Sequence, residues 1–193
     1  MRNRFALAIA APVVLAGCGV NSVPTAEENA KARWADVQNQ YQRRADLIPN
    51  LVATVKGYAK QEQDVLVRVT EARASAGRVQ LSGDDLTDPA KVEAYANAQN
   101  NLSAALVQLR PLQEAYPDLK SNTNFLALQS QLEGTENRIA VARKDYNEAV
   151  QAYNTRIRTF PDAIGAKVFY GAKPMVPFQA TSPGAEAAPT VTF

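Results

Sequence analysis

The chain has 193 residues, enough for one domain with a hydrophobic core. It contains no histidine and a single cysteine, which excludes an intramolecular disulfide and a Cys/His zinc site. It carries 21 basic and 19 acidic residues, and two of the basic residues, Arg2 and Arg4, lie in a segment that we expect to be removed, so the mature chain has no formal net charge. Electrical neutrality argues against a nucleic-acid-binding protein, which needs a clustered positive surface. We also expect no metal, no other cofactor and no small-molecule substrate.

The first 18 residues resemble a bacterial lipoprotein signal peptide. A basic start is followed by a short apolar segment and then by the lipobox Leu15-Ala16-Gly17-Cys18. The resemblance implies cleavage before Cys18, attachment of lipid to its thiol and acylation of the new N-terminus. The alternative is an uncleaved transmembrane helix, but the apolar run is shorter than the roughly 20 residues that span a bilayer. We therefore expect a signal peptide over residues 1–17 and a lipidated tether over residues 18–24.

The expected location is the cell envelope, with the body of the protein outside the cytoplasm, because the basic start of the signal peptide stays on the cytoplasmic side. The residue after Cys18 is glycine rather than aspartate. In a Gram-negative host this fits sorting to the inner leaflet of the outer membrane.

The first predicted helical segment follows the tether. The pair Thr25 and Glu28 is typical of a capping box at a helix start. The apolar seam then continues through Pro49 without a change of phase and ends near Gly77. Proline in a helix interior removes a hydrogen bond, so we expect a kink or short break at residues 47–50 rather than a long loop.

The second half of the chain predicts two more helices after a polar loop at residues 78–88. Pro89 is expected to begin the first, and Pro111 to bend or split it. The second is the longest, from Ser121 to about Phe160, with Ser121 or Asn122 as its cap. Its seam positions alternate steps of three and four, as in a supercoiled helix: Phe125, Leu128, Leu132, Thr135, Ile139, Ala142, Tyr146, Ala149 and Tyr153. Ile157 and Phe160 close the last turns.

These segments predict an all-α fold. We expect an antiparallel bundle of three to four long helices, with a proline-kinked first helix, over residues 25–170. A helical turn fits residues 163–169, and the composition of the remaining chain predicts a flexible C-terminal tail over residues 171–193.

Two long motifs resemble the LemA family of bacterial envelope proteins. The first spans Tyr41–Ala59 and continues at Thr70–Ala74; the second begins at Tyr116-Pro-Asp-Leu-Lys-Ser-Asn122 and runs through the longest helix to Phe160-Pro161. The resemblance covers about residues 30–178. It implies a bundle of long antiparallel helices tied to a membrane by its N-terminus, and it brings no established activity. Family members more often carry an N-terminal membrane-spanning segment, and Pro111 lies where the family pattern suggests uninterrupted helix.

Polar residues beside the two motifs form the candidate site. They are Arg44, Asp46, Asn50, Asn124, Asn137, Arg138, Asn147 and Asn154. Asparagine is a mediocre helix former, so four of them in one helix suggest side-chain amides that cap the break at Pro49 or form hydrogen bonds between helices that fix their register. The alternative is a polar surface for a partner protein. Arg44 and Glu62 also occupy seam positions, where each needs a partner or access to water.

Four tyrosines of the seams are expected to be core aromatics with a hydroxyl at the edge: Tyr41, Tyr58, Tyr146 and Tyr153. The sequence contains no nucleophile elbow and no phosphate-binding loop, and we predict no catalytic residue. The function that fits is a lipid-anchored envelope protein acting as a scaffold or adaptor for another envelope protein. The alternative is a homo-oligomeric structural or membrane-remodelling protein. The expected partners are the membrane, through the N-terminal lipid, and either another protein or a second copy of this chain.

Overall fold

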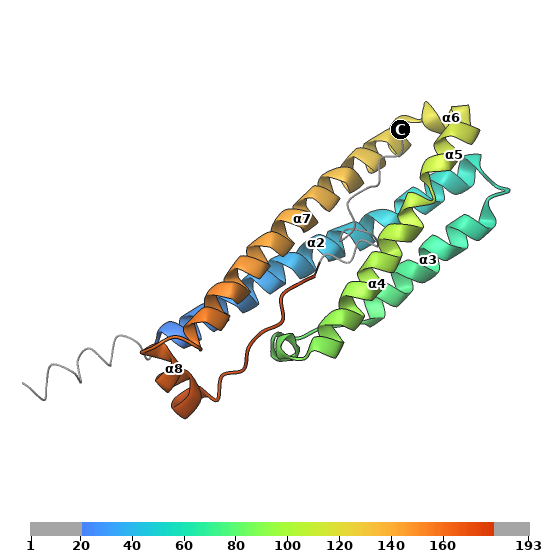
Figure 1. Ribbon diagram of the computed structural model, residues 1–193. Helices are drawn as coiled ribbons and strands as arrows, with labels where there is room; N and C mark the ends of the chain where they lie inside the picture. Colours follow the sequence, from blue (N-terminus) through green and yellow to red (C-terminus); the bar gives the residue numbers. More distant parts are fainter. Residues whose placement is uncertain (1–20, 180–193) are drawn as a thin grey trace, which may run out of the picture. The chain divides into compact units, whose positions relative to one another are not determined.

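The computed structural model describes residues 21–179, and all regular structure in that part of the chain is helical (Figure 1). The elements in order are α2 (Ser22–Tyr58), α3 (Gln63–Arg78), the 3-10 helix η1 (Gly83–Thr87), α4 (Pro89–Val107), α5 (Arg110–Ala115), α6 (Pro117–Lys120), α7 (Thr123–Arg156), α8 (Asp162–Gly165) and the π-helix η2 (Ala166–Tyr170). The predicted all-α class is confirmed. The predicted signal peptide and Cys18 lie outside the described residues.

The chain divides into two compact units, and the long helices α2 and α7 each contribute to both. Unit 1 joins the described residues as far as Tyr41 with Ser82–Pro89 and Asn137–Pro177. Unit 2 joins Gln42–Leu81 with Ala90–Glu136 and the residues from Phe178 onward. Each unit has buried apolar residues of its own.

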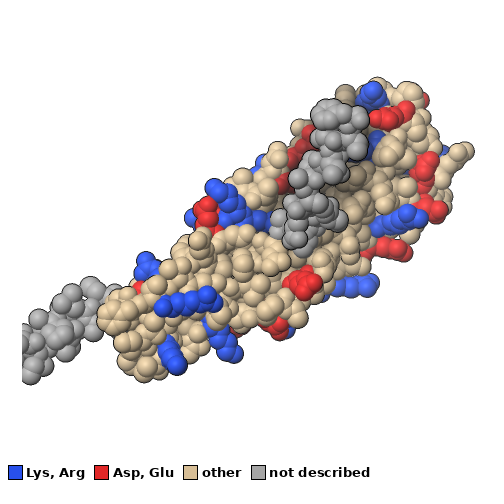
Figure 2. Space-filling view, in the orientation of Figure 1, with Lys and Arg blue, Asp and Glu red and all other residues tan. Residues whose placement is uncertain are grey.

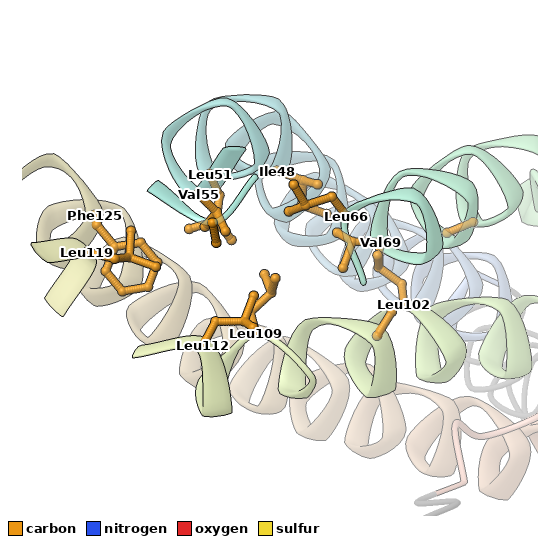
Figure 3. Close-up of a cluster of buried hydrophobic side chains, with 13 residues drawn as sticks. Ile48, Leu51, Val55, Leu66, Val69, Leu102, Leu109, Leu112, Leu119 and Phe125 are labelled. Atoms are coloured by element: carbon orange, nitrogen blue, oxygen red, sulfur yellow. The ribbon is translucent and has the colours of Figure 1, made fainter. Parts of the chain in front are cut away.

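The core of unit 2 is a cluster of 13 buried hydrophobic side chains to which each of the α-helices from α2 to α7 contributes (Figure 3). Figure 3 labels ten of them: Ile48, Leu51, Val55, Leu66, Val69, Leu102, Leu109, Leu112, Leu119 and Phe125. Burying one such side chain contributes roughly 1.5–3 kcal/mol, so helices too short to be stable alone, such as α5 and α6, are held by this cluster.

The core of unit 1 forms where the first part of α2 faces the last part of α7. The rings of Trp34 and Tyr146 pack with their centroids 5.4 Å apart at an angle of 59°. Further along, Tyr153 lies close enough to Glu27 for the carboxylate to affect its pKa. Glu27 lies before Trp34 in α2, whereas Tyr153 lies after Tyr146 in α7, and the two offsets are equal. The two helix segments therefore run antiparallel.

The predicted seam of the longest helix is confirmed over most of its length. Its positions from Phe125 to Tyr153 are buried or half-buried. Phe160 differs, with 83% of its surface exposed, because α7 ends at Arg156 and Phe160 lies in the turn before α8.

The expected break at residues 47–50 is wrong, because α2 continues through Pro49 to Tyr58; a kink there stays a prediction. Pro49 has no N–H, so the carbonyl of Ala45, four residues earlier, lacks its usual helical donor. Arg73 of α3 supplies one: its Nε donates to the Ala45 oxygen at 2.7 Å. A side chain from a neighbouring helix thus satisfies the carbonyl that the proline leaves open.

Replacing Arg73 by methionine is expected to lower the free energy of unfolding by about 1.5–3 kcal/mol, because the Ala45 carbonyl then has no donor. In a Pro49→Ala background the restored N–H supplies that donor, so the same replacement should cost clearly less. Urea denaturation of the four proteins measures this coupling, with Arg68→Met on the exposed side of α3 as the matched control. An equal cost in both backgrounds would contradict this account of Pro49.

The start of α2 also differs from the prediction. The helix begins at Ser22, so part of the expected tether is helical, and Thr25 is inside the first turns instead of capping them. The Thr25 hydroxyl donates to the Asn21 carbonyl at 2.7 Å. Pro24 is tolerated because a first-turn residue needs no N–H.

Local signals placed the later helix boundaries well. Pro89 begins α4, and the helix splits before Pro111, which lies in the first turn of α5. Asn122 caps α7, because its Oδ1 accepts the Phe125 N–H at 2.9 Å. The expected polar loop before α4 instead contains η1, whose Leu86 is completely buried.

Candidate functional site

The structure divides the eight candidate residues between the two units and does not gather them at one place. Unit 2 holds Arg44, Asp46, Asn50 and Asn124, whereas unit 1 holds Asn137, Arg138, Asn147 and Asn154. Arg44 is buried, and Asn147 and Asn154 are half-buried. The exposed members are Asp46, Asn50, Asn124, Asn137 and Arg138. Two local arrangements follow, one around Arg44 and one around Asn154.

Arg44 is the centre of a buried polar network in unit 2, where only 1% of the residue is exposed. Its Nη1 donates to Ser103 Oγ at 2.7 Å and to Glu136 Oε1 at 3.0 Å. Its Nη2 donates to the side-chain oxygen of Gln99 at 2.7 Å and to the backbone oxygen of Gln99 at 3.1 Å. A buried charge is costly unless it is paired and hydrogen-bonded, and the planar guanidinium meets several acceptors at once. The network therefore joins α2, α4 and α7 in one register.

The sequence contained one signal for the partners of Arg44. Gln99 interrupts the apolar seam of α4, between Ala96 and Leu102, and it is itself 5% exposed. A polar residue at a seam position needs a polar partner, as Arg44 does. Two such residues on neighbouring helices could have been paired with each other.

A second arrangement in unit 1, which we call the C-terminal clasp, consists of Tyr146, Tyr153 and Asn154 of α7 and the backbone of residues 173–176. Asn154 Nδ2 donates to the Met175 carbonyl at 2.8 Å, and the Met175 N–H donates to Asn154 Oδ1 at 2.9 Å. The hydroxyls of Tyr146 and Tyr153 donate to the carbonyls of residues 176 and 173, at 2.9 and 3.1 Å. An extended segment cannot satisfy its own backbone groups, so α7 supplies the partners.

The clasp changes the expected boundary of the tail. Residues 172–178 are extended but bound, and Met175 and Phe178 are each only 3% exposed. Gly171 allows the chain to turn from η2 into this extended segment, because its φ of 54° is a left-handed conformation that favours glycine. The Val176 N–H also donates to the Leu86 carbonyl of η1 at 2.8 Å. Residues 180–193 of the expected tail lie outside the described residues.

The two tyrosines of the clasp are neutral hydrogen-bond donors. Burial raises the pKa of Tyr146 far above its usual range. Burial also raises the pKa of Tyr153, with a further increase from the Glu27 carboxylate and an opposing effect of Lys31. Neither hydroxyl is activated as a nucleophile, since activation requires a lowered pKa or an adjacent base.

Replacing Asn154 by alanine is expected to lower the free energy of unfolding by about 1–3 kcal/mol, because both backbone groups of Met175 lose their partner in a half-buried site. Amide hydrogen exchange at Met175 should accelerate more than exchange within α7. Asn154→Asp, which keeps only the acceptor, should give an intermediate result. Asn137→Ala, at an exposed position of the same helix, is the matched control, and equal effects at both positions would contradict a holding role for Asn154.

A shallow groove of about 320 Å³ lies between the end of α2 and α3, lined by Val52, Lys56, Leu66, Val67 and Thr70, among others. Residues 21–179 contain no cluster of three or more His, Cys, Asp or Glu side chains that could hold a metal ion. None of the helices within this range has the length and apolar character needed to cross a membrane.

Comparison with known proteins identifies relatives over most of the chain. Magnetosome protein MamQ 1 and magnetosome protein MamQ 2 of Paramagnetospirillum magneticum are each 27% identical to it over 157 residues, covering 73% of this chain and 58% of the relative. Protein LemA of Metamycoplasma hominis is 25% identical over 124 residues, covering 64% of this chain and 52% of the relative. The chain thus spans little more than half the length of these relatives. The family model described as LemA family matches residues 33–193, well over half of the chain, and the protein therefore belongs to the LemA family.

Proposed function

We propose that this protein is a lipid-anchored component of the bacterial cell envelope that acts as a non-enzymatic scaffold or adaptor for another envelope protein. The observation that carries the proposal is the use of its buried and half-buried polar groups. Arg44, Tyr146, Tyr153 and Asn154 bind backbone and side-chain groups of their own unit. These bonds hold the protein's own helices and C-terminal segment in place, so that exposed side chains on the helices keep fixed positions for a partner.

The lipobox supports the anchor at Cys18. Helix α2 begins at Ser22, four residues after Cys18. Four residues span at most about 14 Å when fully extended. An acylated Cys18 would therefore hold the first turn of α2 close to the membrane surface. Membership in the LemA family, whose pattern implies membrane attachment through the N-terminus, also supports this arrangement.

Exposed polar residues of the candidate set supply surfaces for a partner. In unit 2, Asp46 and Asn50 lie one helical turn apart on α2, and both are exposed. In unit 1, Asn137 and Arg138 are exposed on α7. Long helices keep such groups at fixed spacing, which suits recognition of another protein.

In-cell crosslinking of the tagged, lipidated protein, followed by mass spectrometry, tests the proposal. The expected result is one envelope protein that crosslinks repeatedly near one of these surfaces, and a loss of those crosslinks in Cys18→Ala. Replacing Asp46 and Asn50 together by alanine should weaken crosslinks near α2 without changing stability. If crosslinks join only copies of this chain, a homo-oligomeric structural or membrane-remodelling role replaces the adaptor. Failure to find any acyl chain on Cys18 would overturn the anchor.

A further inference from the structure

Helices α8 and η2 of unit 1, together with Phe160 in the turn before α8, expose large apolar side chains that a folded protein usually buries. The residues and their exposed fractions are Phe160 83%, Ile164 58%, Val168 68%, Phe169 69% and Tyr170 41%. We call this set the α8–η2 surface. Ala166 is buried instead, with only 2% of the residue exposed. Exposed apolar residues that follow one another within consecutive helical turns mark a binding surface far more often than single ones do.

The exposed charged side chains of residues 157–173 are basic, whereas the start of α2 carries Glu27 and Glu28, both of which pair with Lys31. Arg158, Lys167 and Lys173 are exposed. Asp162 is the one acidic residue between positions 157 and 173, and its carboxylate is only 16% exposed and lies 3.6 Å from Arg156. Figure 2 shows uncharged surface interspersed with Lys and Arg side chains around the position that α8 occupies in Figure 1. Apolar side chains flanked by Lys and Arg are typical of segments that lie in the interface of an anionic bilayer.

The α8–η2 surface belongs to the same part of unit 1 as the start of α2. The contact of Trp34 with Tyr146 and the proximity of Glu27 to Tyr153 show that α2 and α7 run antiparallel. The first residue of α2, Ser22, therefore lies beside the end of α7 at Arg156, from which the chain enters α8. Figure 1 shows α8 next to the blue start of α2.

We propose that the α8–η2 surface inserts into the interface of the membrane that holds the N-terminal lipid, as a second contact with the bilayer. The proposal rests on the lipid anchor at Cys18. That anchor would keep the start of α2 within about 14 Å of the acylated residue, so the neighbouring surface meets the bilayer at a high effective concentration. Phe160, Val168 and Phe169 enter the boundary between headgroups and acyl chains, and Lys167 contacts anionic headgroups. Two contacts would fix the orientation of unit 1 on the membrane, which one lipid-bearing tether does not.

Fluorescence quenching of the full-length lipidated protein tests the insertion. Vesicles of phosphatidylcholine and phosphatidylglycerol carry a nitroxide on the lipid chain, and Val168→Cys carries an environment-sensitive dye. The natural chain has one cysteine, and acylation of Cys18 leaves the introduced thiol as the only reactive one. We expect the dye at position 168 to lie about 5–10 Å below the headgroups. The matched control is Val141→Cys, which is 59% exposed on α7 of the same unit and should show little quenching.

A variant carrying Phe160→Ser and Phe169→Ser should reduce quenching at position 168 by about twofold or more, because it removes the two most exposed aromatic anchors. Both side chains are largely exposed, so circular dichroism and the unfolding midpoint should stay unchanged. Quenching at position 168 no stronger than at position 141 would overturn the proposal. A blue-shifted dye without nitroxide quenching would overturn it too, because it indicates contact with another copy of the chain. Failure of the anchor has a different signature: the protein without an introduced cysteine takes up dye at Cys18, and its mass lacks acyl chains.

Discussion

Replacing Arg44 by alanine is expected to lower the free energy of unfolding by about 3 kcal/mol. The replacement removes a buried guanidinium and leaves a cavity, and the side-chain and backbone oxygens of Gln99 lose a donor in a site that is 5% exposed. The side chain of Glu136 is 44% exposed, so water can solvate the carboxylate that is left behind. The expected cost therefore lies at the low end for breaking a buried ion pair. Urea denaturation followed by circular dichroism measures it.

Three further variants separate the buried network from charge alone. Arg43→Ala changes the exposed neighbour and should alter stability by less than about 0.5 kcal/mol. Glu136→Gln keeps an acceptor at a half-exposed position and should cost less than about 1 kcal/mol. Arg44→Lys keeps the charge but not the planar fork, so its cost should approach that of alanine. If Arg44→Ala destabilises no more than Arg43→Ala, the network does not stabilise the register of unit 2.

The helices could be predicted wherever the governing chemistry is local. The seam from Phe125 to Tyr153 depends only on spacing, and Pro89, Pro111 and Asn122 mark boundaries through their own backbone preferences. The short break expected at residues 47–50 is wrong, and the donor that satisfies the Ala45 carbonyl there, Arg73, is distant in sequence; the kink stays a prediction. The predicted seam position of Phe160 is wrong because α7 ends at Arg156, before this residue.

The candidate site was less predictable because it depends on pairing across elements. The seam position of Arg44 required a partner, and Gln99 was visible as a polar residue in the α4 seam, but the choice of Ser103 follows only from how α2 and α4 meet. Tyr58, expected in the core, is 43% exposed because α2 ends there, and the adjacent Ala59 takes the buried position. Residues 172–178 have the prolines of a tail, but side chains of α7 and the Leu86 carbonyl of η1 bind their backbone, and Phe178 packs against Tyr95 of α4.

Stability is expected to fall steeply above about pH 10 because of Tyr146, whose pKa burial raises far above its usual value. The unfolded chain loses this proton near pH 10, whereas the folded protein keeps it. The contribution is therefore complete below about pH 10 and declines as the pH rises, by about 1.4 kcal/mol per pH unit. Between about pH 10 and about pH 12 the loss from Tyr146 amounts to about 2–3 kcal/mol. Urea midpoints measured across this range test the slope.

Tyr146→Phe isolates the buried hydroxyl from the other alkaline groups. At neutral pH it should cost about 1 kcal/mol, because the Val176 carbonyl loses its donor. At alkaline pH the variant should lose stability more slowly than the natural protein, although Tyr153 and Lys31, whose pKa values are also raised, still contribute. Added salt screens surface charges but not a buried phenol, so the difference between the two slopes should persist at high ionic strength. Parallel curves for the two proteins would mean that the Tyr146 hydroxyl ionises as readily in the folded protein as in the unfolded chain. The ionised hydroxyl could no longer donate to the Val176 carbonyl, so this bond of the clasp would be lost near pH 10.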